Sequence, residues 1–170
     1  LMKTGMFNQF NKFQQEEITK GLEENLDVSF YAKPYFNYLQ MGLIKMGLEE
    51  NLDVSIYAKK HFNEYQMFQI KVGLEDNLDV SLYATKDFNE FQMEQIRIAL
   101  LNNVDVSVYS KKEFDWEQMK EIRLGLEKNL NVSFYVNPGF NEHQMYELRR
   151  LLERNAIDFS EFENLTEEEA

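Results

Sequence analysis

The residue types that most often carry chemistry are scarce in this chain. It holds two histidines, His61 and His143, and no cysteine. Neither histidine has an acidic or histidine neighbour at a spacing that repeats or that matches a metal motif, and the lack of cysteine excludes thiolate ligands, disulfides and cysteine nucleophiles. No glycine-rich phosphate loop, GxSxG turn or Ser/His/Asp set is present. The sequence therefore predicts a protein that is not an enzyme, with no catalytic residue, no cofactor and no metal.

A column of aspartates recurs along the chain, each two residues before a serine. Its members are Asp27, Asp53, Asp79 and Asp105. A calcium site would need further loop oxygens, and the ligand series of an EF-hand is absent. We therefore expect each of these aspartates to cap a short helix.

A ladder of tyrosines recurs at the same interval. Its members are Tyr31, Tyr57, Tyr83, Tyr109 and Tyr135. Stacked aromatic side chains can grip a peptide or unpaired bases, but a periodic aromatic residue in stacked repeats more often belongs to the core. We expect a core position, and a peptide or small-molecule receptor that uses the ladder stays open as an alternative.

Both columns belong to a 26-residue repeat, which must position every side chain named above. Its six copies begin at Phe10, Phe36, Phe62, Phe88, Phe114 and Phe140. A unit this short cannot bury its own apolar face, so neighbouring copies are expected to stack as a solenoid.

The second copy shows how the unit folds. Asn37 and Gln40 form a capping box at the start of a helix, and Phe36 and Met41 flank it as a hydrophobic staple. Asn51 suits the left-handed conformation that ends a helix. A small residue lies beside the apolar helix stripe in five copies, and we interpret this column as a close helix contact: Gly21, Gly47, Gly73, Ala99 and Gly125.

The fold class predicted from this unit is all-α, a short α-α solenoid of six repeats with one long and one short helix each. A strand in place of the short helix stays open, because Val54, Ile56 and Tyr57 favour strands. We expect residues 1–9 to form an N-terminal flank, residues 10–165 a single helical-repeat domain, and residues 166–170 an acidic tail. The sequence begins with Leu1 rather than Met, so we expect its ends not to be the natural ones.

Composition limits the partners. The formal net charge of −12 opposes binding to nucleic acid and to anionic membranes, which both attract Lys and Arg. A protein partner with a basic surface matches better. No apolar run is long enough to cross a bilayer and no signal peptide is present, so we expect a soluble, cytoplasmic protein. Association through the end repeats is left open.

Function should lie in what changes from copy to copy. Three variable columns lie two, three and six residues past the opening Phe, away from the apolar stripe. Large aromatics stand there without a structural need, and we predict that they anchor a partner: Tyr38, Phe68, Trp116 and Tyr146. We also predict an acidic ridge at the helix ends of the first three copies, a second candidate contact: Glu23, Glu24, Glu49, Glu50, Glu75 and Asp76. An acidic mimic of nucleic acid that occupies a basic groove is the alternative function.

The string F-N-x-x-Q-M-x-x-I-x-x-G-L-E-x-N-L-D-V-S-x-Y-A resembles short repeats in uncharacterised proteins of bacterial phages and other mobile elements. The resemblance extends from Phe10 to about Phe162. It implies a helical-repeat fold and a mobile-element setting. An acidic binding protein in that setting is expected to inhibit a host defence protein.

Overall fold

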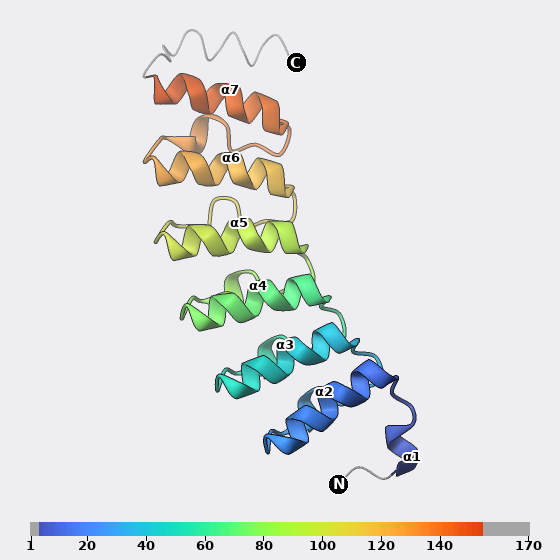
Figure 1. The fold of residues 1–170 in the computed structure, drawn as a ribbon. Coiled ribbons are helices and arrows are strands. Elements are labelled where there is room, and N and C mark those ends of the chain that lie inside the picture. The colour runs from blue at the N-terminus through green and yellow to red at the C-terminus, as the bar shows by residue number, and fades with distance from the viewer. Residues whose placement is uncertain (1–3, 155–170) are drawn as a thin grey trace. The chain divides into compact units, whose positions relative to one another are not determined.

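The computed structural model describes residues 4–154 as an all-helical chain (Figure 1). A short helix, α1 (Thr4–Phe7), precedes the repeats. Each repeat then contributes one twelve-residue α-helix, and no strand occurs within the described residues. The long helices are α2 (Lys12–Glu23), α3 (Tyr38–Glu49), α4 (Glu64–Glu75), α5 (Glu90–Leu101), α6 (Trp116–Glu127) and α7 (Glu142–Glu153).

The capping box starts these helices as predicted. In the second copy Asn37 Oδ1 accepts a hydrogen bond from Gln40 N at 2.8 Å, and Gln40 Oε1 accepts one from Asn37 N at the same distance. The helix ends are also confirmed, because the asparagine that follows each C-cap has a positive φ of 56–58°. Those residues are Asn25, Asn51, Asn77, Asn103 and Asn129; the sixth, Asn155, lies outside the described residues.

The short element of the repeat is a single 3-10 turn, so the helical alternative is confirmed over the strand. It forms η1 (Val28–Phe30), η2 (Val54–Ile56), η3 (Val80–Leu82) and η4 (Val132–Phe134). The aspartate caps it: Asp53 Oδ1 accepts from Ser55 N at 3.2 Å and from Ser55 Oγ at 2.5 Å. In the fourth copy the same segment is a turn. The predicted equivalents in the sixth copy, around Asp158 and Phe162, lie outside the described residues.

The tyrosine ladder is core, as expected, and it explains the glycine column. All five rings have 0% exposure. The Tyr83 hydroxyl donates a hydrogen bond to the carbonyl of Gln69 at 2.8 Å, and a Cβ on Gly73 would lie only 1.9 Å from that hydroxyl oxygen. Our interpretation of the column as a contact between helices was therefore wrong about the partner. The glycine leaves room for the tyrosine of its own repeat.

The capping-box glutamine also ties neighbouring repeats of the first unit together. Gln40 Nε2 donates to the carbonyl of Phe62 at 2.7 Å, and Gln66 Nε2 donates to that of Phe88 at 2.8 Å. Both glutamines are buried. A buried amide that lost this partner would carry a desolvation cost, so the bond fixes the register between repeats.

The structure divides into two compact units, one that ends at Arg97 and one that begins at Ile98. In the first unit α2, α3 and α4 pack side by side in chain order, and in the second α6 packs against α7 (Figure 1). This is the consecutive helix packing of an α-α solenoid. The single domain over residues 10–165 stays a prediction, and the acidic tail lies outside the described residues. Among the described helices, none combines the length and apolar character that crossing a bilayer requires.

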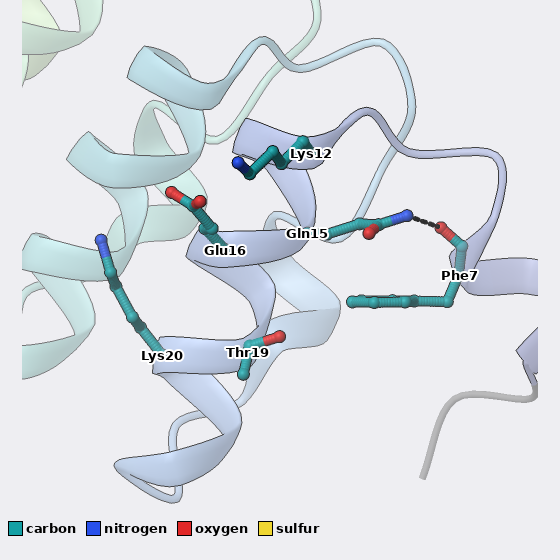
Figure 2. Close-up of a pocket in the computed structure, with 6 residues that line it drawn as sticks. All are labelled: Phe7, Lys12, Gln15, Glu16, Thr19 and Lys20. Carbon is teal, nitrogen blue, oxygen red and sulfur yellow. Dashed lines mark hydrogen bonds between the residues drawn. The ribbon is translucent and has the colours of Figure 1, made fainter.

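The flank before the repeats covers the first long helix. Gln15 replaces the buried methionine of the other copies. Its Nε2 donates to the carbonyl of Phe7 at 3.1 Å (Figure 2) and to that of Phe10 at 2.9 Å. The Phe7 ring lies beside Gln15 and Thr19 in a shallow pocket of this end. The polar side chain of Gln15 suits this terminal repeat, because its neighbour on this side is α1 rather than another repeat.

Candidate functional site

Six large apolar side chains of the first unit form an exposed surface, which we call the aromatic band. They lie within the first five residues of the long helices and are 44–62% exposed, whereas the Phe, Met, Ile and Tyr columns behind them are buried. The Phe13 and Tyr38 rings touch from adjacent repeats, with centroids 5.2 Å apart. The band consists of Phe13, Tyr38, Leu39, Tyr65, Phe68 and Phe91.

Between α4 and α5 the band is hollowed. The α4–α5 hollow has a volume of about 280 Å³ and is lined by Tyr65, Phe68, Gln69, Glu90, Phe91 and Glu94. The Gln69 side chain is held in place, because its Oε1 accepts a hydrogen bond from Arg97 Nε at 2.7 Å. The hollow thus combines three aromatic rings with two carboxylates and one anchored amide.

The four predicted anchors do not share one environment. Tyr38 and Phe68 lie in the aromatic band of the first unit. In the second unit Trp116 is half-buried at the start of α6, and Tyr146 on α7 is exposed beneath the guanidinium of Arg149, 5.4 Å from its ring centre. A role for all four residues in partner binding stays a prediction, and the proposal below departs from it by assigning binding to Tyr38 and Phe68 of the band and not to Trp116 or Tyr146.

Four of the six residues of the band were not among the predicted anchors: Phe13, Leu39, Tyr65 and Phe91. Phe13, Tyr65 and Phe91 occupy the column three residues past the opening Phe, which varies among copies. Four successive copies place a large apolar residue in that column, and a search for apolar side chains at outward positions would have found it. The predicted anchors are instead aromatic residues that differ from the other members of their own columns.

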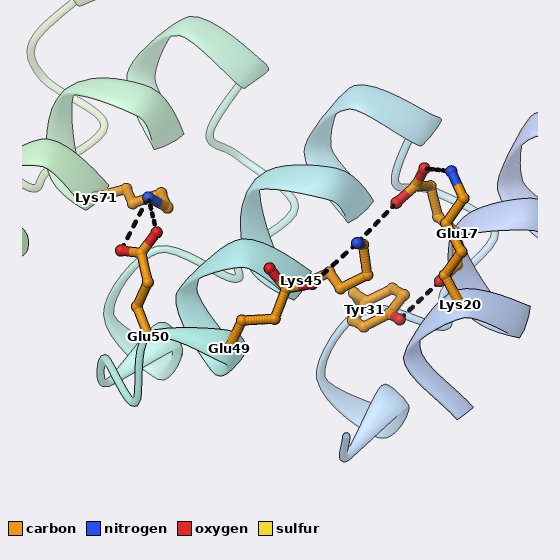
Figure 3. A network of polar contacts seen from close by, with 7 residues as sticks. All are labelled: Glu17, Lys20, Tyr31, Lys45, Glu49, Glu50 and Lys71. Atoms are coloured by element: carbon orange, nitrogen blue, oxygen red, sulfur yellow. Dashed lines mark hydrogen bonds and ion pairs between the residues drawn. The ribbon is translucent and has the colours of Figure 1, made fainter. Parts of the chain in front are cut away.

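The predicted acidic ridge is exposed, but it is bridged by two lysines that the prediction did not include (Figure 3). Lys45 Nζ lies 3.0 Å from Glu49 and 3.8 Å from Glu17 of the preceding repeat. Lys71, with 4% of its side chain exposed, lies 3.0 Å from Glu50 of the preceding repeat and also pairs with Glu75. These lysines partly neutralise the ridge and link consecutive repeats.

The pKa values in the ridge follow from these pairs. Burial works to lower the pKa of Lys71, but the hydrogen bonds and charges of Glu75 and Glu50 outweigh it and raise that pKa. The hydrogen bond from Lys71 lowers the pKa of Glu75. Both groups therefore stay charged across the neutral range.

The second unit arranges the equivalent positions differently. There the residue after the helix is a donor: Asn102 Nδ2 lies 3.0 Å from Glu127, and Lys128 Nζ lies 2.8 Å from Glu153 of the following repeat. In the first unit the corresponding positions are carboxylates, and Glu24 lies against Glu49. The position after the long helix is thus a carboxylate in the first unit, on the helices that also carry the aromatic band, and not in the second.

The two histidines contact an aromatic ring and a carboxylate, respectively. The His61 ring lies against the Phe62 ring at a tilt of 59°, with ring centres 4.2 Å apart, and His143 Nε2 lies 3.9 Å from Glu147. Within residues 4–154 no group of three or more His, Cys, Asp or Glu side chains is arranged to hold a metal ion. Because the tyrosine rings are buried, the ladder offers no accessible surface to a peptide or small molecule.

No protein family model, curated protein or solved structure matches this chain.

Proposed function

We propose that this chain is a non-enzymatic protein-binding module and that it contacts its partner through the aromatic band. The observation that supports this proposal is the exposure of these six large apolar side chains on one unit, where the Phe, Met, Ile and Tyr columns of the same repeats are buried. A contiguous apolar patch on a protein surface commonly marks an interaction site. Tyrosine and phenylalanine bury a large area with few rotatable bonds, so they suit such a contact.

The charge beside the band indicates the partner's chemistry. Along α4, Tyr65, Phe68 and Val72 are followed on the same face by Asp76, because these residues are three or four positions apart. A partner that covers this face contacts apolar side chains along α4 and a carboxylate at the carboxyl end of the helix. We therefore expect a segment that carries aromatic or aliphatic anchors next to Lys or Arg.

A random peptide library selected against the purified chain tests this expectation. Selected peptides should combine apolar anchors with basic residues, and their affinity can be measured by fluorescence anisotropy. Burying a half-exposed aromatic ring contributes about 1–2 kcal/mol, so the double variant Tyr65→Ala with Phe68→Ala should weaken binding by roughly tenfold or more. Circular dichroism checks that the variant remains folded.

Tyr146→Ala is the matched control, because Tyr146 occupies the repeat position of Phe68 in the second unit and is similarly exposed. It should leave the affinity unchanged. Equal losses from both variants would refute the assignment of binding to the aromatic band. Selection of purely polybasic peptides, with an affinity that falls steeply with salt, would favour the nucleic-acid mimic instead. That the partner is a host defence protein stays a prediction from the resemblance.

A further inference from the structure

The α4–α5 hollow differs from the surfaces between α6 and α7 and between α2 and α3. At the equivalent positions of α6 and α7 the chain carries Glu117, Lys120, His143 and Tyr146, so that Lys120 replaces Phe68. Between α2 and α3 the two rings, Phe13 and Tyr38, pack on one another. Between α4 and α5, by contrast, three rings and two carboxylates line one hollow.

The two carboxylates of the hollow differ from those of the acidic ridge. Glu90 and Glu94 are half-buried, and neither forms an ion pair with another residue of the described range. Glu49, Glu50 and Glu75 of the ridge are by contrast bridged by lysine. A half-buried carboxylate beside aromatic rings meets less competing water, which strengthens its interaction with an incoming cation.

We infer that the α4–α5 hollow is a subsite for an arginine side chain of the partner, an inference that rests on the proposed function. A guanidinium group is planar, so its face can lie on a Tyr or Phe ring while its edge donates hydrogen bonds to a carboxylate. Tyr65, Phe68 and Phe91 supply the rings, and Glu90 and Glu94 supply the acceptors. The alkyl stem of the arginine covers the remaining apolar wall.

The chemistry favours arginine over lysine. An ammonium group is strongly hydrated and acts as a point charge, whereas a guanidinium group loses water more easily and binds a carboxylate through two parallel bonds. The Gln69 amide is already fixed by Arg97, so the hollow keeps its shape without the ligand. Binding to a preorganised site loses little free energy to the ordering of its side chains.

Three small probes separate charge from apolar contact: butylguanidinium, its uncharged isostere butylurea, and butylammonium. Each is titrated into the isotopically labelled full chain and followed by NMR. We expect saturable shifts at Tyr65, Phe68 and Phe91, with butylguanidinium bound roughly tenfold more tightly than butylurea. Equal affinity for butylguanidinium and butylurea would show a merely apolar hollow, and equal or tighter binding of butylammonium would overturn the preference for arginine.

A matched pair of variants tests the carboxylates. Glu90→Gln should weaken butylguanidinium binding about fivefold or more. Glu142→Gln removes the carboxylate from the same repeat position, in the first turn of α7, and should leave binding unchanged. If both variants reduce binding equally, the probe senses only the net charge and the subsite does not exist.

The subsite and the proposed function can fail separately. Selected peptides that lose affinity on Phe68→Ala but keep it on Glu90→Gln would retain the protein-binding module and refute the arginine subsite. Peptides indifferent to both variants would refute both.

Discussion

Replacing Gly73 with alanine should destabilise the protein, although alanine is the better helix former. In an open helix this change stabilises by about 0.5–1 kcal/mol. Here the new Cβ would lie 1.9 Å from the Tyr83 hydroxyl oxygen and 2.7 Å from Val80 Cγ1, so the tyrosine or the 3-10 turn must move. The glycine is therefore expected to be a packing requirement.

The size of the effect follows from three contributions. Overpacking costs about 1–3 kcal/mol, and displacing the ring breaks the hydrogen bond from Tyr83 to the Gln69 carbonyl, which contributes about 0.5–1.5 kcal/mol. After the helix-propensity gain is subtracted, the net loss is about 2 kcal/mol. With a urea m-value of about 2 kcal/mol/M, the unfolding midpoint should fall by about 1 M.

Urea denaturation followed by circular dichroism measures this change, and the fourth copy offers the control. That copy carries Ala99, which is buried, and its short element is a turn instead of a 3-10 helix. Ala99→Gly should cost about 1 kcal/mol from helix propensity alone. In a Tyr83→Phe background the cost of Gly73→Ala should shrink, because the nearest obstacle is gone, but not vanish, because Val80 remains. If Gly73→Ala stabilised the protein, the packing argument would be refuted.

Two further predictions concern the links between repeats and the buried charges. Gln66→Ala removes both the capping-box bond and the bond to the Phe88 carbonyl, whereas Gln144→Ala removes the capping-box bond of α7. In urea denaturation Gln66→Ala should therefore lower the free energy of unfolding by about 1 kcal/mol more than Gln144→Ala does. Equal losses would argue against a stabilising link between repeats. Stability should also fall at both pH extremes, as pH-dependent thermal unfolding can measure. The lowered pKa of Glu75 gives stability that is present above its ordinary value of 4.5 and is lost as the pH falls through the folded pKa. Burial raises the pKa of Tyr83, so the stability that comes from its neutral form is present below 10 and is lost as the pH rises above it. Lys71→Met should reduce the acid sensitivity, and an unchanged acid profile would exclude the pair as its source.

Much of the fold could be predicted because its signals are local. Asn37 and Gln40 are three residues apart, and the capping box they form requires no knowledge of the rest of the chain. The positive φ of Asn51 likewise follows from the end of its own helix. Repetition strengthened these predictions, since a chance pattern does not recur at one interval.

The candidate site was less predictable because exposure depends on neighbours. Tyr38 and Phe68 could be selected as variable aromatics, but the sequence did not show that Tyr65 and Phe91 complete a hollow with Phe68. The acidic ridge was visible as a run of carboxylates, while Lys45 and Lys71, which lie among them, come from a different part of the helix.

The sequence by itself determined the 26-residue unit, the start and end of each long helix and the burial of the tyrosine ladder, because capping, helix termination and apolar periodicity act within one repeat. Only the tertiary structure decided which side chains meet. The glycine column accommodates a hydroxyl from ten residues further along the chain, Gln66 reaches the following repeat, and Glu90 faces rings from α4. These contacts depend on the distance and rotation between stacked elements, which packing sets and no single repeat encodes.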